Sequence, residues 1–98
     1  MRAIAVLAGL ALASPLAAAA QSVTPIEVMA ATCGGCHGTG LAGAGGVPGL
    51  TGRKMDAIEL LLNDFKSGQR PATVMNRLAK GYSPEQITEL AQYISGLK

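Results

Sequence analysis

The chain is 98 residues long and carries eight Lys and Arg residues against six Asp and Glu residues, a formal net charge of +2 at neutral pH. Its length predicts one small domain. The near balance of charge, without a basic block interleaved with aromatic residues, excludes a nucleic-acid-binding protein.

The first 20 residues predict a secretory signal peptide. Arg2 is their single charge, an apolar run covers residues 3–13, and Ala18-Ala19-Ala20 forms an A-x-A cleavage pattern. The apolar run is shorter than the ~20 residues that span a bilayer, which disfavours an uncleaved membrane anchor. We therefore expect cleavage after about Ala20, no permanent membrane span afterwards, and a mature domain over residues 21–98.

A short helix is expected next. Thr24 is a candidate N-cap, Pro25 suits the first helical position, and Glu27 completes a capping box. The apolar residues that follow at helical spacing are Ile26, Met29, Ala30 and Cys33. This helix leads directly into the segment ATCGGCHGTG, which contains both cysteines and the only histidine of the chain.

Residues 34–52 are rich in glycine and show no alternating strand pattern. Such a segment predicts a loop whose backbone turns sharply or approaches another group closely. A flexible linker is the alternative, but it would be unusual inside so small a domain.

The remaining residues predict two more helices with a loop between them. Residues 53–66 form an amphipathic pattern, with Gly68 as a C-terminal stop, and residues 69–82 are expected to be a loop with about one helical turn. Ser83 and Gln86 repeat the capping pattern before a last helix that runs to residue 94. The predicted fold is therefore all-α, with short helices and long loops.

The sequence Cys-x-x-Cys-His, formed by Cys33, Cys36 and His37, is the attachment signal of c-type haem. Two thiols separated by two residues reach the two vinyl groups on one edge of the macrocycle, and the next imidazole then faces the iron. We therefore predict one covalent haem c, with thioethers at Cys33 and Cys36 and with His37 as the proximal iron ligand. The haem would also complete the core of a small domain.

Three other uses of these residues fit less well. A redox dithiol with this spacing normally lies in a βαβ context, and no strand is predicted. A zinc site needs four ligands, whereas the segment offers two cysteines and one histidine. A structural disulfide across so tight a loop would give little chain-entropy stabilisation.

The sixth iron ligand is predicted to be a methionine, because the chain has no second histidine. Met29 lies one helical turn before Cys33, on the attachment side, and is expected to pack in the core. Met55 begins the amphipathic helix, whereas Met75 lies in the later loop, which can return across the far face of the ring. We therefore predict Met75 as the ligand and keep Met55 as the alternative.

Two further features are expected around the iron. The carbonyl of Pro48 is predicted to accept a hydrogen bond from the second ring nitrogen of His37, unless Pro48 only shapes the turn. The dry pocket that lowers the dielectric around the iron is expected to consist of Ile58, Leu61, Leu62, Ile87 and Leu90.

The motif at residues 33–37, the PGL sequence at 48–50, Met75 and the C-terminal LAQYISGL together resemble class I bacterial c-type cytochromes. This resemblance implies the cytochrome c fold, with crossing N- and C-terminal helices and the haem in the core. It also implies the hydrogen bond between His37 and Pro48 and the Met75 ligand. The implied function is electron transfer in the periplasm, without enzymatic activity.

Residues 65–94, FKSGQRPATVMNRLAKGYSPEQITELAQYI, resemble more narrowly the single-haem cytochrome subunit of flavocytochrome c sulfide dehydrogenase. This implies a flavin-containing sulfide dehydrogenase subunit as electron donor, docked through a largely apolar and salt-insensitive interface, and a cytochrome or an oxidase as acceptor. Two alternatives stay open: a free soluble shuttle between other partners, and a haem sensor or peroxidase with an open sixth site. Arg70, Arg77 and Lys80 flank the Met75 loop and are expected to pair with haem propionates, to steer an acidic partner, or simply to be solvated.

Overall fold

The computed structural model describes residue 3, residue 9 and residues 23–98. The predicted signal peptide, residues 1–20, therefore lies outside the described residues apart from those two isolated positions. Residues 23–98 contain five α-helices and one 3-10 turn, and their only strand-like pairing is an isolated bridge between Ala44 and Val47. The all-α prediction is confirmed for this part of the chain.

The N-terminal helix α1 (Pro25–Ala31) begins as its sequence predicts. The Thr24 hydroxyl accepts a hydrogen bond from the backbone N–H of Glu27 at 3.4 Å, and the Glu27 carboxylate accepts one from the backbone N–H of Thr24 at 2.6 Å. The chain passes almost without interruption into α2 (Gly34–His37), because Cys33, the N-cap of α2, has helical backbone angles.

The glycine-rich segment is a folded loop. It begins with the 3-10 turn η1 (Thr39–Leu41) and returns to that turn, where Leu41 accepts hydrogen bonds from the backbone N–H groups of Leu50 at 2.7 Å and Thr51 at 3.2 Å. A Cβ atom on Gly49 would lie 2.6 Å from the Ala42 carbonyl oxygen, so only glycine permits this approach.

Helix α3 (Met55–Ser67) ends at Gly68, whose left-handed backbone (φ 83°) is the stop that the sequence predicts. The next segment differs from its prediction, since α4 (Met75–Lys80) is longer than one turn. The reason is tertiary: α4 packs against α3 and buries Ala79 completely. Helix α5 (Pro84–Ser95) begins with the capping box of Ser83 and Gln86.

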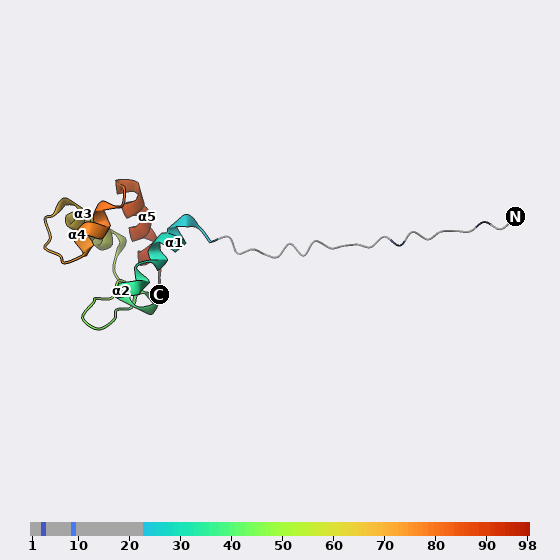
Figure 1. Cartoon of the computed structure of the whole chain (residues 1–98), viewed down its shortest axis with the longest axis horizontal. Helices are drawn as coiled ribbons and strands as arrows, with labels where there is room; N and C mark the ends of the chain where they lie inside the picture. The colour runs from blue at the N-terminus through green and yellow to red at the C-terminus, as the bar shows by residue number, and fades with distance from the viewer. Residues whose placement is uncertain (1–2, 4–8, 10–22) are drawn as a thin grey trace.

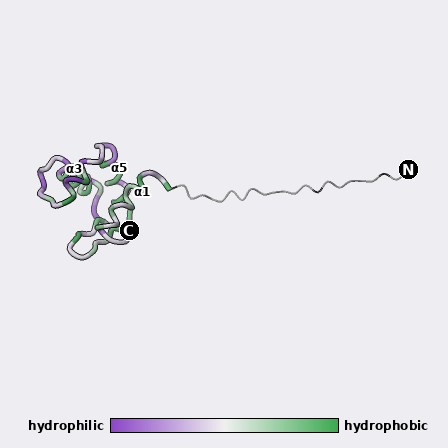
Figure 2. The backbone as a smooth tube through the Cα atoms, in the orientation of Figure 1, coloured by the Kyte–Doolittle hydropathy of each residue, from purple (hydrophilic) through white to green (hydrophobic). Residues whose placement is uncertain are grey.

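Helix α5 is the centre of the packing. Figure 1 shows α5 between α3 and α4 on one side and α1 on the other, and both α1 and α3 contact it. In Figure 2, hydrophobic and hydrophilic residues alternate along the helices, as expected of amphipathic helices with one buried side. The buried hydrophobic cluster consists of Ala30, Leu41, Ile58, Leu90, Ala91 and Ile94.

Candidate cofactor site

Helix α2 brings the cysteine motif together. Cys33 is its N-cap, Cys36 and His37 form its last two positions, and the His37 backbone N–H donates to the Cys33 carbonyl at 2.9 Å. Residues three and four positions apart share one side of a helical turn, so both thiols and the imidazole are neighbours. Both cysteines are free thiols, Cys33 half-buried and Cys36 exposed.

Burial raises the pKa of the Cys33 thiol, and a side-chain hydrogen bond from Thr32 opposes this effect. The Cys33 thiol is therefore less ionised at neutral pH than an exposed cysteine would be. A pair of reduced thiols, rather than a disulfide, is also the form that can add to the vinyl groups of a haem.

His37 is held in one orientation. Its side chain is 8% exposed, and its Nδ1 lies 2.6 Å from the Pro48 carbonyl oxygen. The carbonyl can only accept, so Nδ1 carries the proton and donates it. The lone pair of the imidazole is then on Nε2, which is the atom that would bind a metal ion.

The loop that carries Pro48 is itself fixed by several hydrogen bonds. The Gly43 backbone N–H donates to the His37 carbonyl at 2.6 Å, and Arg53 Nε donates to the Gly49 carbonyl at 3.0 Å. The close contact of Gly49 with Ala42 adds a steric constraint. The contacts of Arg53 and Ala42 fix Gly49, the residue that follows Pro48, a role of Arg53 that the sequence analysis did not find.

The candidate ligand Met75 lies on a different element from the motif. It is the first residue of α4 and is half-buried. Met29 and Met55, by contrast, pack against the buried hydrophobic cluster. Two of the three methionines in the described part of the chain therefore pack against the core, and Met75 is not among the residues packed there.

Asn76, directly after Met75, carries a buried polar atom that the sequence analysis did not single out. Its side-chain Oδ1 is buried and has no hydrogen-bond partner in the described residues. Buried polar atoms are rarely left without a partner in folded proteins. Oδ1 accepts hydrogen bonds and an ionised haem propionate also only accepts them, so a propionate cannot be the missing partner. Asn76 therefore lies beside Met75 without an assigned role in the site.

The apolar residues expected around the iron are not equally buried. Ile87 and Leu90 are almost completely buried and Ile58 is 4% exposed, whereas Leu61 and Leu62 are only half-buried. The apolar residues of α3 pack against two helices, α4 and α5, so they are buried to different extents.

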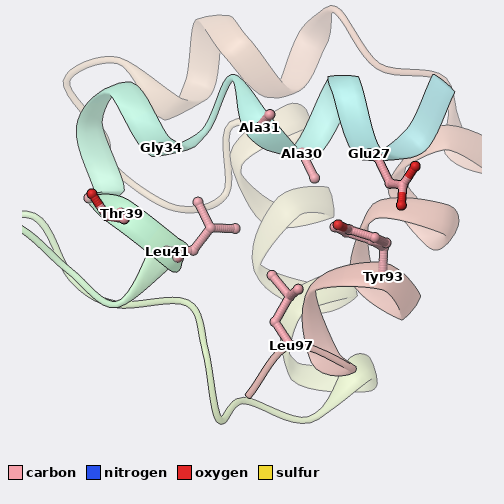
Figure 3. Close-up of a pocket in the computed structure, with 10 residues that line it drawn as sticks. Glu27, Ala30, Ala31, Gly34, Thr39, Leu41, Tyr93 and Leu97 are labelled. Atoms are coloured by element: carbon pink, nitrogen blue, oxygen red, sulfur yellow. The ribbon is translucent and has the colours of Figure 1, made fainter. Parts of the chain in front are cut away.

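A cavity of about 440 Å³ lies between α1, η1 and the end of α5. Figure 3 shows Ala30, Leu41, Tyr93 and Leu97 around it, with Glu27 at its edge. Cys33, Cys36, His37 and Met75 do not line this cavity, so it is distinct from the candidate site; it borders α2 through Gly34 and Gly38.

The described residues contain neither a preformed metal-binding cluster nor a membrane-spanning helix. Across residues 23–98, no group of three or more His, Cys, Asp and Glu side chains is arranged to hold a metal ion. None of the helices found there is long and apolar enough to cross a membrane.

The chain is similar to proteins of known families. The sequence model of a family described as cytochrome C oxidase, cbb3-type, subunit III matches residues 21–94. The cytochrome subunit of sulfide dehydrogenase from Chlorobaculum tepidum is 40% identical over 85 residues, which cover 82% of the chain and 77% of that protein. The thiosulfate dehydrogenase electron acceptor of Thiomonas intermedia is 41% identical over 98 residues, 98% of the chain but only 43% of that longer protein.

A third relative, cytochrome c-553 of Helicobacter pylori, is 37% identical over 81 residues, which cover 81% of the chain and 84% of that protein. Each of the three similarities covers 81% or more of the chain.

Proposed function

The chain belongs to the cytochrome c family, whose members carry electrons, and from that premise we propose that it is a periplasmic electron carrier with one covalently attached haem c. The observation that carries this proposal is the geometry of α2. Two free thiols and a buried imidazole share one helical turn, and the Pro48 carbonyl fixes Nδ1 of the imidazole so that Nε2 is available.

The proposed roles of the residues follow from that geometry. Cys33 and Cys36 would hold the haem through thioethers, and His37 and Met75 would be the ligands of its iron. The haem supplies an iron that alternates between two oxidation states. The protein would hold His37 and Met75 in place and exclude water with its buried apolar side chains, and so would limit the rearrangement between those states.

Domain organisation and location are part of the same proposal. Residues 1–20 act as a signal peptide, and residues 21–98 form the mature single-haem domain. Attachment of haem through thioethers is tested by acid-acetone extraction of the purified protein, which should leave the haem on the polypeptide. Extraction of the haem into the organic phase would reject covalent attachment.

We also propose that the electron donor is the flavin-containing subunit of a sulfide dehydrogenase. The similarity to a protein named as the cytochrome subunit of sulfide dehydrogenase supports this donor, since the chain spans most of that protein. The acceptor would be another cytochrome or an oxidase. The test is haem reduction on mixing the oxidised cytochrome with the sulfide-reduced flavoprotein; no reduction would reject this donor.

A free shuttle is the second candidate, favoured by the exposed basic residues Arg77 and Lys80 beside Met75. A relative named as a thiosulfate dehydrogenase electron acceptor also supports a carrier between other partners. Co-purification with a flavoprotein distinguishes the two candidates, because a shuttle would not remain bound. A haem sensor or peroxidase would instead require that Met75 does not bind the iron, so that the sixth coordination position stays open.

A further inference from the structure

A lysine on α3 is tied to the segment that follows α4. Lys66 lies in the last turn of α3 with its side chain half-buried, and its ammonium donates a hydrogen bond to the Tyr82 carbonyl. Tyr82 comes directly after Gly81, the C-cap of α4, and packs against the buried hydrophobic cluster. One side-chain hydrogen bond thus joins the end of α3 to the end of α4.

The acceptor of this bond belongs to the last turn of α4. The Tyr82 backbone N–H donates to the Ala79 carbonyl at 3.2 Å, so the Tyr82 peptide continues the hydrogen bonding of the helix. Carbonyl groups at the C-terminal end of a helix attract a cation. Between Asp64 and Glu85 the chain contains four basic residues and no acidic residue, so no carboxylate of this stretch competes with the carbonyl for the ammonium.

The other end of α4 is only loosely restrained. Val74, its N-cap, is 51% exposed and makes no capping hydrogen bond with its side chain. Residues 69–71 and 73, which precede it, are exposed as well. The chain that leads into Met75, the first residue of α4, therefore does little to fix the position of this methionine.

The position of Met75 then depends on how α4 itself is held. The helix has six residues and is about 9 Å long, so a shift at its C-terminal end is carried to its first residue. Figure 1 shows α4 beside α3, and two contacts hold it there: the complete burial of Ala79 and the hydrogen bond from Lys66. Of these two contacts, the one made by Lys66 lies at the end opposite to Met75.

We propose that Lys66 is a positioning residue for the sixth iron ligand. By fastening the C-terminal end of α4 to α3, it keeps the sulfur of Met75 at the iron in both oxidation states. This proposal rests on the proposed function, because it requires Met75 to be a ligand. Loss of the bond from Lys66 to the Tyr82 carbonyl lets α4 move away from α3 and opens the sixth coordination position more often.

Two simpler roles of Lys66 compete with this one. A solvated lysine would make the bond only in passing, but a half-buried side chain directed at a helix-terminal carbonyl speaks against that role. Alternatively, Lys66 stabilises the fold as a whole without acting on Met75. A measurement at the iron distinguishes this second role from positioning.

The first test measures how easily the sixth coordination position opens. Imidazole added to the oxidised protein binds the iron only when Met75 has left it, so its apparent affinity reports the fraction of the protein in the open state. Lys66→Met removes the ammonium but keeps an unbranched side chain. We expect this change to lower the imidazole concentration for half-saturation by about five-fold or more, since a hydrogen bond from a charged group stabilises the closed state.

Two further variants are the controls. Lys66→Arg keeps a cationic donor at the same position and should bind imidazole nearly as the wild type does. Lys54→Met removes the same charge at the other end of α3, where Lys54 is exposed, and should leave the affinity for imidazole unchanged. Equal effects of Lys66→Met and Lys54→Met would attribute the change to net charge and overturn the proposal.

Urea unfolding and the absorbance spectrum are measured on the same samples. If Lys66→Met is less stable but binds imidazole as the wild type does, Lys66 supports the fold alone and the positioning role is rejected. A wild-type protein without haem, or without the absorbance band of iron bound to methionine sulfur, means that the proposed function or its ligand fails. A normal band with no effect of Lys66→Met means that the positioning proposal alone fails.

The second test needs no variant, so it decides even if Lys66→Met does not fold. Amide hydrogen exchange of the wild type is followed with and without saturating imidazole. The N–H groups of Gly81 and Tyr82, which donate within the last turn of α4, should exchange faster when imidazole occupies the sixth position, whereas the amides of α1 should not change. Unchanged exchange at both residues would show that Met75 leaves the iron without release of α4, and would contradict the proposal.

Discussion

At the scale of single residues, His37 has the most fully determined environment. The Pro48 carbonyl accepts its Nδ1–H, its own carbonyl accepts the Gly43 N–H, and it is nearly buried. Each of these contacts comes from the glycine-rich loop. The loop therefore sets the orientation of the imidazole, and changes in the loop should be detected at the iron.

Gly49 provides a sharp test of that dependence. Gly49→Ala would place a Cβ atom 2.6 Å from the Ala42 carbonyl oxygen, so the loop must shift. We expect the free energy of unfolding to fall by about 1–3 kcal/mol, typical of overpacking. The reduction potential should move as well, because the Pro48 carbonyl moves with the loop.

Gly46→Ala is the matched control for this change. Gly46 belongs to the same loop, and an added Cβ there meets nothing within 4 Å. Urea unfolding and redox titration of both variants should show an effect of Gly49→Ala alone. If both substitutions have similar effects, the loop does not position the imidazole through this contact.

The predicted role of Met75 as an iron ligand can be tested by spectroscopy of the bond between its sulfur and the iron. Met75→Ala should abolish the weak long-wavelength absorbance band of iron bound to methionine sulfur in the oxidised protein, and should lower the reduction potential, because His/Met ligation raises it. Met55→Ala should keep the band, because Met55 packs against the core. Loss of the band only in the Met55 variant would show that Met55, and not Met75, is the iron ligand.

Site residues differ in how far the sequence could predict them. Cys33, Cys36 and His37 form a local motif, and Pro48 could be proposed because a carbonyl was needed nearby. Arg53 could not be found, since its significance depends on a contact with the Gly49 carbonyl. Such facts depend on tertiary packing rather than on residue type.

At the scale of elements, some helices follow from local sequence and others depend on tertiary packing. The starts of α1 and α5 were predictable because Thr24 and Glu27, like Ser83 and Gln86, form local capping boxes. The sequence predicts a loop with about one turn here, because the segment begins with Pro71 and ends at Gly81. In the structure, Val74 is the N-cap of α4 and makes no capping hydrogen bond with its side chain. The length of α4 is decided by the burial of Ala79 against α3. The apolar pattern of its six residues is too short to predict a helix of that length.

The capping box of α1 should make stability depend on pH. A backbone hydrogen bond from Thr24, followed by one from its side chain, lowers the pKa of Glu27 below the ordinary value of a glutamate. The ionised carboxylate thus stabilises the folded state at pH values above that ordinary pKa. This contribution is lost as the pH falls through the lowered pKa of the folded state.

The pH dependence is measured by urea unfolding of the wild type and Glu27→Gln between neutral and acid pH. The wild type should be the more stable protein at neutral pH, and the difference should shrink as the solution is acidified. A difference that stays constant over this range would show that the charge of Glu27 does not contribute.

At the scale of the whole molecule, the packing around α5 supports two separate parts of the site. Helix α2, which follows α1 directly, carries the thiols and the imidazole, and α4, which packs against α3, carries Met75. Helix α5 contacts both α1 and α3. A haem held between these parts would complete the core of a small domain, which explains why a sequence with few aromatic residues folds into short helices and long loops.

The central claim is that the mature chain carries one haem through two thioethers, and the intact mass of the protein purified from the periplasm tests it most directly. We expect the mass of residues 21–98 plus one haem, and we expect that added mass to be lost when both Cys33 and Cys36 are replaced by alanine. A polypeptide mass without haem in the wild type, or an added haem that persists in the double variant, would contradict the account.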